Sequence, residues 1–364
     1  MKAKAAVFMG AEKNFEVREF PVVDAPKGYG RTELIASGIC GTDIHFHNGK
    51  LVTMPETVIG HEFVGRITDI NDEDAKKYSL EKGDNVIADI AVPCGECVLC
   101  KSGDDANCVN MQVTNGGSIY ESPYLYGGYS EVNFTPLSNL IKIPDSVDPV
   151  AAAVFACPGP TVFHSFSLAE KAGVSLSDVK CAVVQGLGPV GIFALIYLKK
   201  MGVPKVYAVT GGKNKKRAET AVSLGAEKVL SIARDGAENI INELSRENDG
   251  LGVDLCFEAS GIPSAVAQGM TVLRNRGVYL IPGQYSNSGG IEIQPQMITF
   301  KALHIIGSSQ YSVVDVKNYL SFMAEHTDVQ KTALTLCSKY SVDRINEAFA
   351  DAKNAENIKT LLVK

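Results

Sequence analysis

The sequence lacks several features that would assign it to particular protein classes. None of its apolar runs reaches the roughly 18 residues of a membrane helix. The opening MKAKAAVFMGAEKNFEV meets Glu12 too early for a secretion signal. It also has no basic tail, and its formal net charge is −6. These absences predict a cytoplasmic protein with neither a membrane partner nor a nucleic-acid partner.

Cysteine and histidine are scarce, and both are unevenly placed. Nine cysteines in 364 residues are too few for a disulfide framework, yet four of them lie between residues 94 and 108. Three of the six histidines stand between residues 45 and 61. The chain is longer than the roughly 250 to 300 residues at which a single core stops growing. We therefore expect two domains, and metal sites in place of disulfides.

The segment PCGECVLCKSGDDANC, residues 93–108, spaces its cysteines as C-x2-C-x2-C-x7-C. Thiolates at this spacing can bind one ion from a single loop, as in a tetrahedral zinc site. An iron–sulfur cluster is the alternative, but the bacterial ferredoxin pattern has a shorter last gap and a proline where this chain has Val109. Four thiolates leave no open position for a substrate, so this zinc would be structural. The predicted ligands are Cys94, Cys97, Cys100 and Cys108.

A glycine pattern, GLGPVG at residues 186–191, stands between the apolar segments VKCAVVQ and VGIFALIYLKKMG. Strand, glycine turn and helix form the context that a dinucleotide-binding motif requires. Gly186 would allow the tight turn, Gly188 the approach of a pyrophosphate to the helix N-terminus, and Gly191 the packing of helix on strand. The predicted cofactor contacts here are Gly186, Leu187, Gly188, Pro189, Val190 and Gly191. Further segments follow, among them KVYAVT as a strand and residues 214–224 as a helix, which predicts an α/β fold with a doubly wound parallel sheet of the Rossmann type.

The segment VTGGKNKKR, residues 209–217, bears on which dinucleotide would bind. NAD sites place an acidic residue on the ribose 2′-hydroxyl about 20 positions after the motif, but this segment has no carboxylate. Its lysines, Lys213, Lys215 and Lys216, lie at a predicted helix start. The helix dipole disfavours cations there unless an anion is near. A 2′-phosphate would be that anion, so we expect NADP in preference to NAD; an exposed basic surface is the other interpretation. The predicted contacts are Gly211, Gly212, Lys213 and Arg217.

The stretch GICGTDIHFHNGKLVTMPETVIGHEFVG, residues 38–65, contains Cys40 and a Gly-His-Glu triplet. With the cysteine lobe and the glycine motif, it resembles the zinc-dependent medium-chain dehydrogenases, the alcohol and polyol dehydrogenase family, over essentially the whole chain. The resemblance implies that Cys40, His61 and Cys157 bind a catalytic zinc. Two thiolates and one imidazole would leave a fourth position open for a substrate. Without the family, Cys157 reads equally well as a buried thiol.

The resemblance also implies roles for neighbouring side chains. Zinc would lower the pKa of a substrate hydroxyl bound at the open position. Thr42 would accept the proton, and His45, which titrates near neutrality, would pass it to solvent. Glu62 matches a glutamate that lies behind the zinc and assists exchange of its fourth ligand. Thr161 matches a threonine beside the nicotinamide.

The implied architecture places a Rossmann dinucleotide-binding domain, residues 156–301, between residues 1–155 and 302–364, which form a mostly β, GroES-like catalytic domain. The implied activity is a zinc-dependent oxidoreductase that interconverts a secondary alcohol or polyol with its ketone. It would hold two zinc ions and NADP or NAD, in a homodimer or homotetramer. One alternative is a zinc-free relative of the quinone-reductase type, which would not need the three predicted catalytic ligands. Another is a zinc-lobe interaction or nucleic-acid protein, which the acidic balance disfavours.

Overall fold

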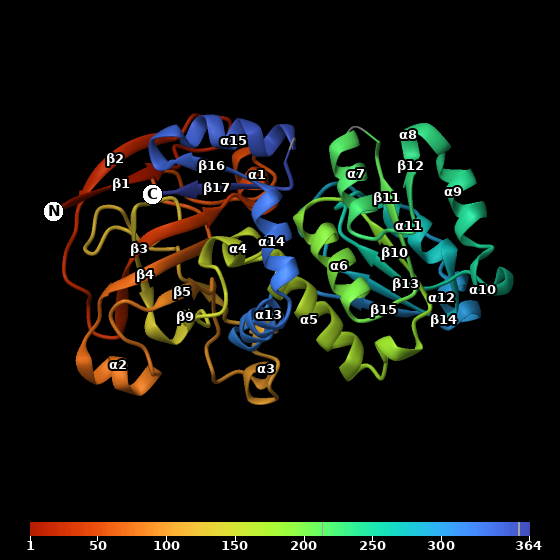
Figure 1. Ribbon diagram of the computed structural model, residues 1–364, viewed down its shortest axis with the longest axis horizontal. Coiled ribbons are helices and arrows are strands. Elements are labelled where there is room, and N and C mark those ends of the chain that lie inside the picture. The colour runs from red at the N-terminus through yellow and green to blue at the C-terminus, as the bar shows by residue number, and fades with distance from the viewer. Residues whose placement is uncertain (213, 356) are drawn as a thin grey trace. The chain divides into compact units, whose positions relative to one another are not determined.

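The computed structural model describes residues 1–212, 214–355 and 357–364. The chain forms two compact units: unit 1 comprises Met1–Pro160 and Gln310–Lys364, and unit 2 comprises Thr161–Ser309. Helix α5 (Pro158–Lys171) carries the chain from unit 1 into unit 2 (Figure 1). Among the described residues, no helix combines the length and the apolar character that a membrane crossing requires.

Unit 2 contains a six-stranded parallel sheet with the order β12-β11-β10-β13-β14-β15. The central strands β10 (Cys181–Gln185) and β13 (Val253–Glu258) are buried along their whole length. Figure 1 shows helices on both sides of this sheet, and a parallel sheet covered on both faces has such buried strands. The predicted doubly wound sheet is confirmed. The other strands are β11 (Lys205–Thr210), β12 (Lys228–Ser231), β14 (Leu273–Ile281) and β15 (His304–Gly307).

The helices of unit 2 begin at residues that suit helix starts. Helix α6 (Pro189–Lys200) has Pro189 in its first turn, where a missing N–H costs nothing. Helix α7 (Lys215–Ser223) begins after Asn214, whose side chain accepts a hydrogen bond from Arg217 N at 3.0 Å. The other helices are α8 (Ile232–Asp235), α9 (Ala237–Leu244), α10 (Glu247–Gly250), α11 (Pro263–Val272) and α12 (Gln296–Lys301), with the 3-10 turn η3 (Leu176–Asp178).

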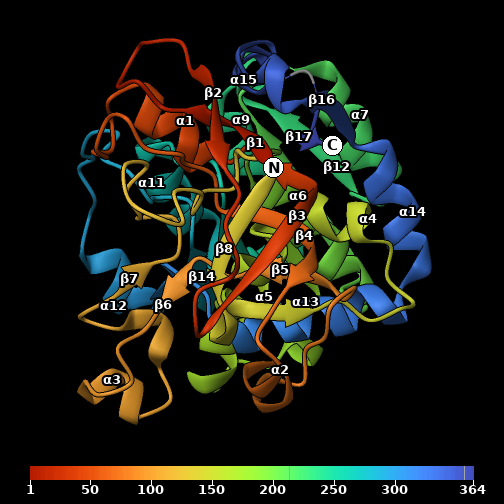
Figure 2. The same ribbon diagram turned by 90° about the vertical axis from the view of Figure 1, so that its left-hand side faces the viewer.

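Unit 1 is built on a seven-stranded sheet with the order β16-β17-β3-β4-β5-β9, in which β8 also pairs with β3. The C-terminal strand β17 (Lys359–Val363) pairs antiparallel with β3 (Tyr29–Gly38), so the second segment of unit 1 completes a sheet that the first begins (Figure 2). The other strands of this sheet are β4 (Glu62–Asp69), β5 (Asn85–Ala88), β8 (Val132–Pro136), β9 (Leu140–Lys142) and β16 (Cys337–Ser341). Two-stranded sheets join β1 (Lys2–Val7) to β2 (Glu16–Pro21) and β6 (Ala91–Val92) to β7 (Gln112–Val113).

The helices of unit 1 are mostly short. Helix α4 (Pro149–Val154) begins after Asp148, whose carboxylate accepts hydrogen bonds from Val150 N and Ala151 N at 2.8 and 2.9 Å. The other helices are α1 (Gly41–His47), α2 (Asp72–Tyr78), α3 (Val98–Lys101), α13 (Val313–Glu325), α14 (Thr327–Thr335) and α15 (Ile345–Asn354), with the 3-10 turns η1 (Asp105–Asn107), η2 (Leu137–Asn139) and η4 (Val342–Arg344).

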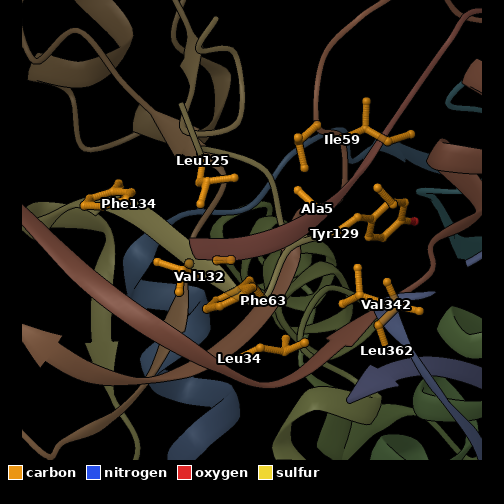
Figure 3. Packing of buried hydrophobic residues seen from close by; sticks show 14 of the residues in the cluster. Ala5, Leu34, Ile59, Phe63, Leu125, Tyr129, Val132, Phe134, Val342 and Leu362 are labelled. Carbon is orange, nitrogen blue, oxygen red and sulfur yellow. The ribbon is translucent and has the colours of Figure 1, made fainter. Parts of the chain in front are cut away.

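The core of unit 1 draws side chains from both of its segments. Figure 3 shows Leu34 of β3, Phe63 of β4 and Phe134 of β8 gathered with Leu362 of β17. All four are buried, and burying each such side chain contributes about 1.5–3 kcal/mol. The core therefore fixes β3 and β4 against one another, and the ends of these two strands lead to predicted metal ligands.

Candidate active site

Four side chains that could bind a metal come together in unit 1. The ligand atoms of Cys40, His61, Glu62 and Cys157 all lie within 4.8 Å of one another. Cys40 follows β3 and precedes α1, while His61 directly precedes β4. The antiparallel β3–β4 pairing places Gly38 opposite Glu62, which brings these two ligands together. Cys157 lies between α4 and α5.

The carboxylate of Glu62, the fourth member of this cluster, forms a buried ion pair with Lys359 of β17. The side chains of Glu62 and Lys359 are 0% and 1% exposed. Gly38 makes room for the pair, because a Cβ there would collide with Glu62. Burial raises the pKa of Glu62 to about 7, although the positive charge of Lys359 opposes this. Glu62 thus has a cationic partner inside the core.

Asp43 connects two of the predicted ligands. Its Oδ1 lies 3.5 Å from His61 Nδ1, and its Oδ2 accepts hydrogen bonds from Cys40 N at 2.9 Å and from the Tyr129 hydroxyl at 2.7 Å. Burial would lower the pKa of His61, but the negative charges of Asp43 and Cys40 raise it well above its ordinary value. A carboxylate in this position fixes the orientation of a metal-binding imidazole.

The two thiols of the cluster have opposite pKa shifts. The contact with Cys157 lowers the pKa of Cys40 well below its ordinary value, and the contact with Cys40 raises the pKa of Cys157 well above its own. Without a metal, the two sulfur atoms thus share one negative charge between them. A dication between them would let both be thiolates, so the donor set of Cys40, His61 and Cys157 fits zinc.

The predicted proton relay lies on α1, next to this cluster. Thr42 Oγ1 is 3.8 Å from Cys40 Sγ. His45 follows on the same helix and is half-buried, and this burial lowers its pKa. His47 faces a different environment, because its ring centroid lies 5.0 Å from that of Phe349.

The four cysteines of the lobe also lie together, with all four sulfur atoms within 4.8 Å of one another. Cys97 Sγ is 3.5 Å from Cys100 Sγ and 4.0 Å from Cys108 Sγ. A tetrahedral ion with Zn–S bonds of about 2.3 Å holds its sulfur atoms about 3.8 Å apart. The amide of Cys100 is the largest of the influences that lower the pKa of Cys97 to about 6, which favours the thiolate. The sulfur–sulfur distances fit one zinc ion and are too short for a cluster of several irons.

The glycine turn of unit 2 has the geometry that its motif predicts. Gly186 has a φ of +95°, and a Cβ on it would lie 2.7 Å from Ser260 Cα. A Cβ on Gly191 would collide with the Gly186 carbonyl oxygen, so helix and strand are in close contact. A Cβ on Gly188 would meet no described atom within 4 Å, so the backbone at the start of α6 is open. The turn is completed by buried Leu187 and half-buried Pro189 and Val190.

Gly212, two residues after the end of β11, cannot carry a side chain in its present conformation. Its φ is +94°, and a Cβ would collide with Ser231 Oγ. A cavity of about 680 Å³ lies beside it, and its lining includes the cations Lys215 and Arg234 and the carboxylate Glu219. The backbone therefore excludes an acidic residue at this position, and basic side chains stand nearby.

The remaining predicted cofactor residues differ in exposure. Gly211 is exposed. Arg217 lies in the first turn of α7, and burial lowers its pKa. Thr161 is half-buried in the first turn of α5. Lys213 lies outside the described residues.

Sequence reasoning missed two residues that support the candidate zinc site. Lys359 contacts Glu62 across about 300 residues of chain, and its signal would have been a single lysine at the head of the apolar strand KTLLV. Tyr129 donates to Asp43, and nothing in its local sequence indicates this partner.

Comparisons with known proteins agree with this geometry. Residues 31–145 match the family described as "Alcohol dehydrogenase GroES-like domain", and residues 189–325 match "Zinc-binding dehydrogenase". A 5-exo-hydroxycamphor dehydrogenase of Pseudomonas putida is 28% identical over 372 aligned positions, covering 99% of this chain and 98% of that protein. An L-threonine 3-dehydrogenase of Shewanella baltica (strain OS185) is 30% identical over 296 positions, covering 79% and 80%.

The fold has a close counterpart among solved structures. An alcohol dehydrogenase from Thermotoga maritima superposes with a TM-score of 0.88 at 24% identity, over 100% of this chain and 99% of that one. At this identity the likeness concerns the fold alone. Together with the sequence matches, the fold and the two cysteine clusters lead to one assignment: the chain belongs to the zinc-dependent medium-chain dehydrogenase family, which comprises alcohol and polyol dehydrogenases.

Proposed function

We propose that the protein is a zinc-dependent dehydrogenase that interconverts a secondary alcohol or polyol with its ketone, and that it uses NADP in preference to NAD. The observation that carries the proposal is the convergence of Cys40, His61 and Cys157 in unit 1, in a chain whose unit 2 bears an open glycine turn before a helix N-terminus. The names of the two relatives, a hydroxycamphor dehydrogenase and a threonine 3-dehydrogenase, agree with an alcohol substrate.

Each residue near the cluster has a defined task in this proposal. When bound, zinc supplies a Lewis acid that lowers the pKa of a substrate hydroxyl, and the dinucleotide supplies the hydride acceptor. Cys40, His61 and Cys157 would hold the catalytic ion, and Asp43 would keep the imidazole oriented. Glu62 would stand behind the site as a carboxylate balanced by its ion pair.

Thr42 and His45 would move the substrate proton to solvent. The Thr42 hydroxyl lies next to Cys40, so it can accept a proton from a substrate hydroxyl held at the cluster while donating its own. Burial lowers the pKa of His45, which keeps the imidazole neutral, and therefore able to accept a proton, at neutral pH.

The preference for NADP rests on the surroundings of Gly212. A carboxylate cannot be attached there without moving Ser231, so the usual partner of a ribose 2′-hydroxyl is missing at this position. Lys215 and Arg234 line the adjacent cavity and would attract a 2′-phosphate. An exposed basic surface with no ligand is the competing explanation.

Absorbance of reduced nicotinamide provides the first test, with NADP or NAD and a panel of polyols, cyclic alcohols and aliphatic secondary alcohols. Turnover with NADP would support the whole proposal. Turnover with NAD alone would contradict the 2′-phosphate assignment and leave the zinc chemistry standing. Lys215→Ala should weaken NADP binding far more than NAD binding, and equal effects on both would favour the exposed surface.

Zinc content tests the assignment of Cys157. Cys157→Ala should abolish turnover and lower the zinc content from two ions per chain to one, because one of the two cysteine clusters would lose a ligand. Cys337→Ala is the matched control, since Cys337 is a half-buried thiol that belongs to neither cluster. Unchanged metal in the Cys157 variant would refute its role as a ligand.

A further inference from the structure

We propose that Glu258 is a positioning residue for the dinucleotide: its buried carboxylate ties together the two loops that follow β13 and β14, and so fixes the surface on which the cofactor lies. The inference deepens the proposed function and rests on it. Glu258 is the last residue of β13. It lies outside the glycine motif and outside both clusters of candidate metal ligands.

Glu258 sits at the point in the sheet where a ligand is expected. The chain passes from β10 outward to β11 and β12, and then returns to the other side of β10 as β13. The strand order therefore reverses between β10 and β13. In open α/β sheets, ligands bind outside the carboxyl ends of the strands at such a reversal. Glu258 marks the carboxyl end of one of these two strands, and the glycine turn follows the other.

Four hydrogen bonds hold the Glu258 carboxylate, which is 0% exposed. Its Oε1 accepts from Ser260 N at 2.7 Å, from Ser260 Oγ at 2.5 Å and from Gly261 N at 3.0 Å. Its Oε2 accepts from Gln284 Nε2 at 3.1 Å. The first oxygen thus shapes the loop after β13, and the second reaches the loop after β14. All four donors are neutral groups, so an amide oxygen in the same place could also accept their hydrogen bonds.

The loop that Glu258 shapes is in direct contact with the glycine turn. Gly186 packs so closely against it that a Cβ would lie 2.7 Å from Ser260 Cα. A Cβ on Gly283 would collide with Glu258 Oε2, so the loop after β14 is equally tight. Gly283 N also donates to the Glu258 carbonyl oxygen at 2.9 Å. Three strand-end turns are therefore packed backbone to backbone, and a shift of one displaces the others.

Removing the carboxylate should loosen these turns where the cofactor would lie. Glu258→Ala loses all four contacts and leaves the donors of both loops without this acceptor, which costs more than the loss of the hydrogen bonds alone. Glu258→Gln keeps an oxygen for the three donors of the first loop, and its amide can pair with Gln284 once the Gln284 amide is turned over. The glutamine variant removes the charge and preserves the geometry, so it should rescue binding.

Asp254 provides a matched control on the same strand. It is also buried, accepts hydrogen bonds from Lys180 N and Cys181 N at 2.8 Å, and pairs with Arg274. It lies at the amino end of β13, whereas Glu258 lies at the carboxyl end. Asp254→Ala should therefore cost stability without altering cofactor affinity, which separates a general loss of structure from a loss of positioning.

The experiment measures the dissociation constants of NADP and NAD by isothermal titration calorimetry on the zinc-loaded protein, because the chain has no tryptophan to report binding. We expect Glu258→Ala to weaken binding at least about tenfold, the factor that corresponds to the loss of about one such contact, with Glu258→Gln within about threefold of wild type and Asp254→Ala unchanged. KM for the dinucleotide should rise more than kcat falls. If the alanine variant does not fold, Gln284→Ala, which removes only the second loop's contact, should still raise the dissociation constant.

Equal dissociation constants for Glu258→Ala and Asp254→Ala, or for Gln284→Ala and wild type where the first variant does not fold, would overturn the inference. A glutamine variant as weak as the alanine variant would overturn it too, because charge and not geometry would then matter. Wild-type protein that binds neither NADP nor NAD would instead refute the proposed function, and this inference with it.

Discussion

Removing the hydroxyl of Tyr129 would test whether its contact with Asp43 stabilises the proposed catalytic zinc site. Tyr129 is fully buried and donates to Asp43 Oδ2 at 2.7 Å, while Asp43 Oδ1 faces His61 Nδ1 at 3.5 Å. Tyr129→Phe removes this bond and keeps the ring, including its edge contact with Phe15 at 6.0 Å. A hydrogen bond to a charged group contributes about 1.5–3 kcal/mol. Losing an outer partner of a metal ligand costs roughly 10- to 100-fold in affinity, or about 1.4–2.7 kcal/mol, so the two estimates agree.

We therefore expect Tyr129→Phe to release the catalytic zinc about 10 to 100 times more readily in competition with a coloured chelator. The cysteine lobe of residues 94–108 would hold its own zinc through different residues, so that zinc would provide an internal reference. Tyr78→Phe, at a half-buried ring of α2, controls for the loss of a tyrosine hydroxyl elsewhere. Release of both zinc ions at unchanged rates, or equal acceleration of both, would refute the reasoning.

Two further predictions concern buried charge in unit 1. Lys359→Met leaves Glu62 buried without its partner, so we expect urea denaturation to show that the free energy of unfolding falls by about 3–5 kcal/mol. Adding Glu62→Gln should recover most of this stability. A double variant as unstable as the single one would contradict the prediction. Burial raises the pKa of Asp89 from 3.8 to about 8, and nearby Asp105 and Asp315 add to the shift. The folded state then binds a proton that the unfolded state has released, so stability should fall as pH rises from about 4 to 8, by up to about 1.4 kcal/mol per pH unit. Asp89→Asn should flatten this decline in urea midpoints measured from pH 5 to 8, and an unchanged slope would rule out the buried proton.

Sequence patterns within one short segment correctly predicted the elements whose structure depends on that segment alone. The expected strand KVYAVT coincides with β11 (Lys205–Thr210), and the helix expected over residues 214–224 is α7 (Lys215–Ser223). The glycine motif and the cysteine lobe are equally local: each uses fewer than about 20 consecutive residues, so spacing alone specifies their geometry.

The remainder depends on contacts between distant parts of the chain. Lys359 reaches Glu62 only because β17 pairs with β3, and Tyr129 reaches Asp43 across 86 residues. Sequence periodicity indicates which residues of a strand are buried, but it does not say which strand lies next to which. Glu258 had a readable signal, since a carboxylate ends the apolar run VDLCFE, but its partners lie in two separate loops and emerge only with the fold.

The split of unit 1 has a consequence for how the protein is made. Translation at roughly 5–20 residues per second must add the 199 residues from position 161 to position 359 before β17 is available, a delay on the order of 10–40 s. During that time the carboxyl half of β3 has an unpaired edge, which favours aggregation. The carboxylate of Glu62 also lacks its ion-pair partner Lys359. Unit 2 is continuous in sequence and can fold within the same interval. A chaperone that shields the nascent first segment during this delay should therefore raise the yield of active protein.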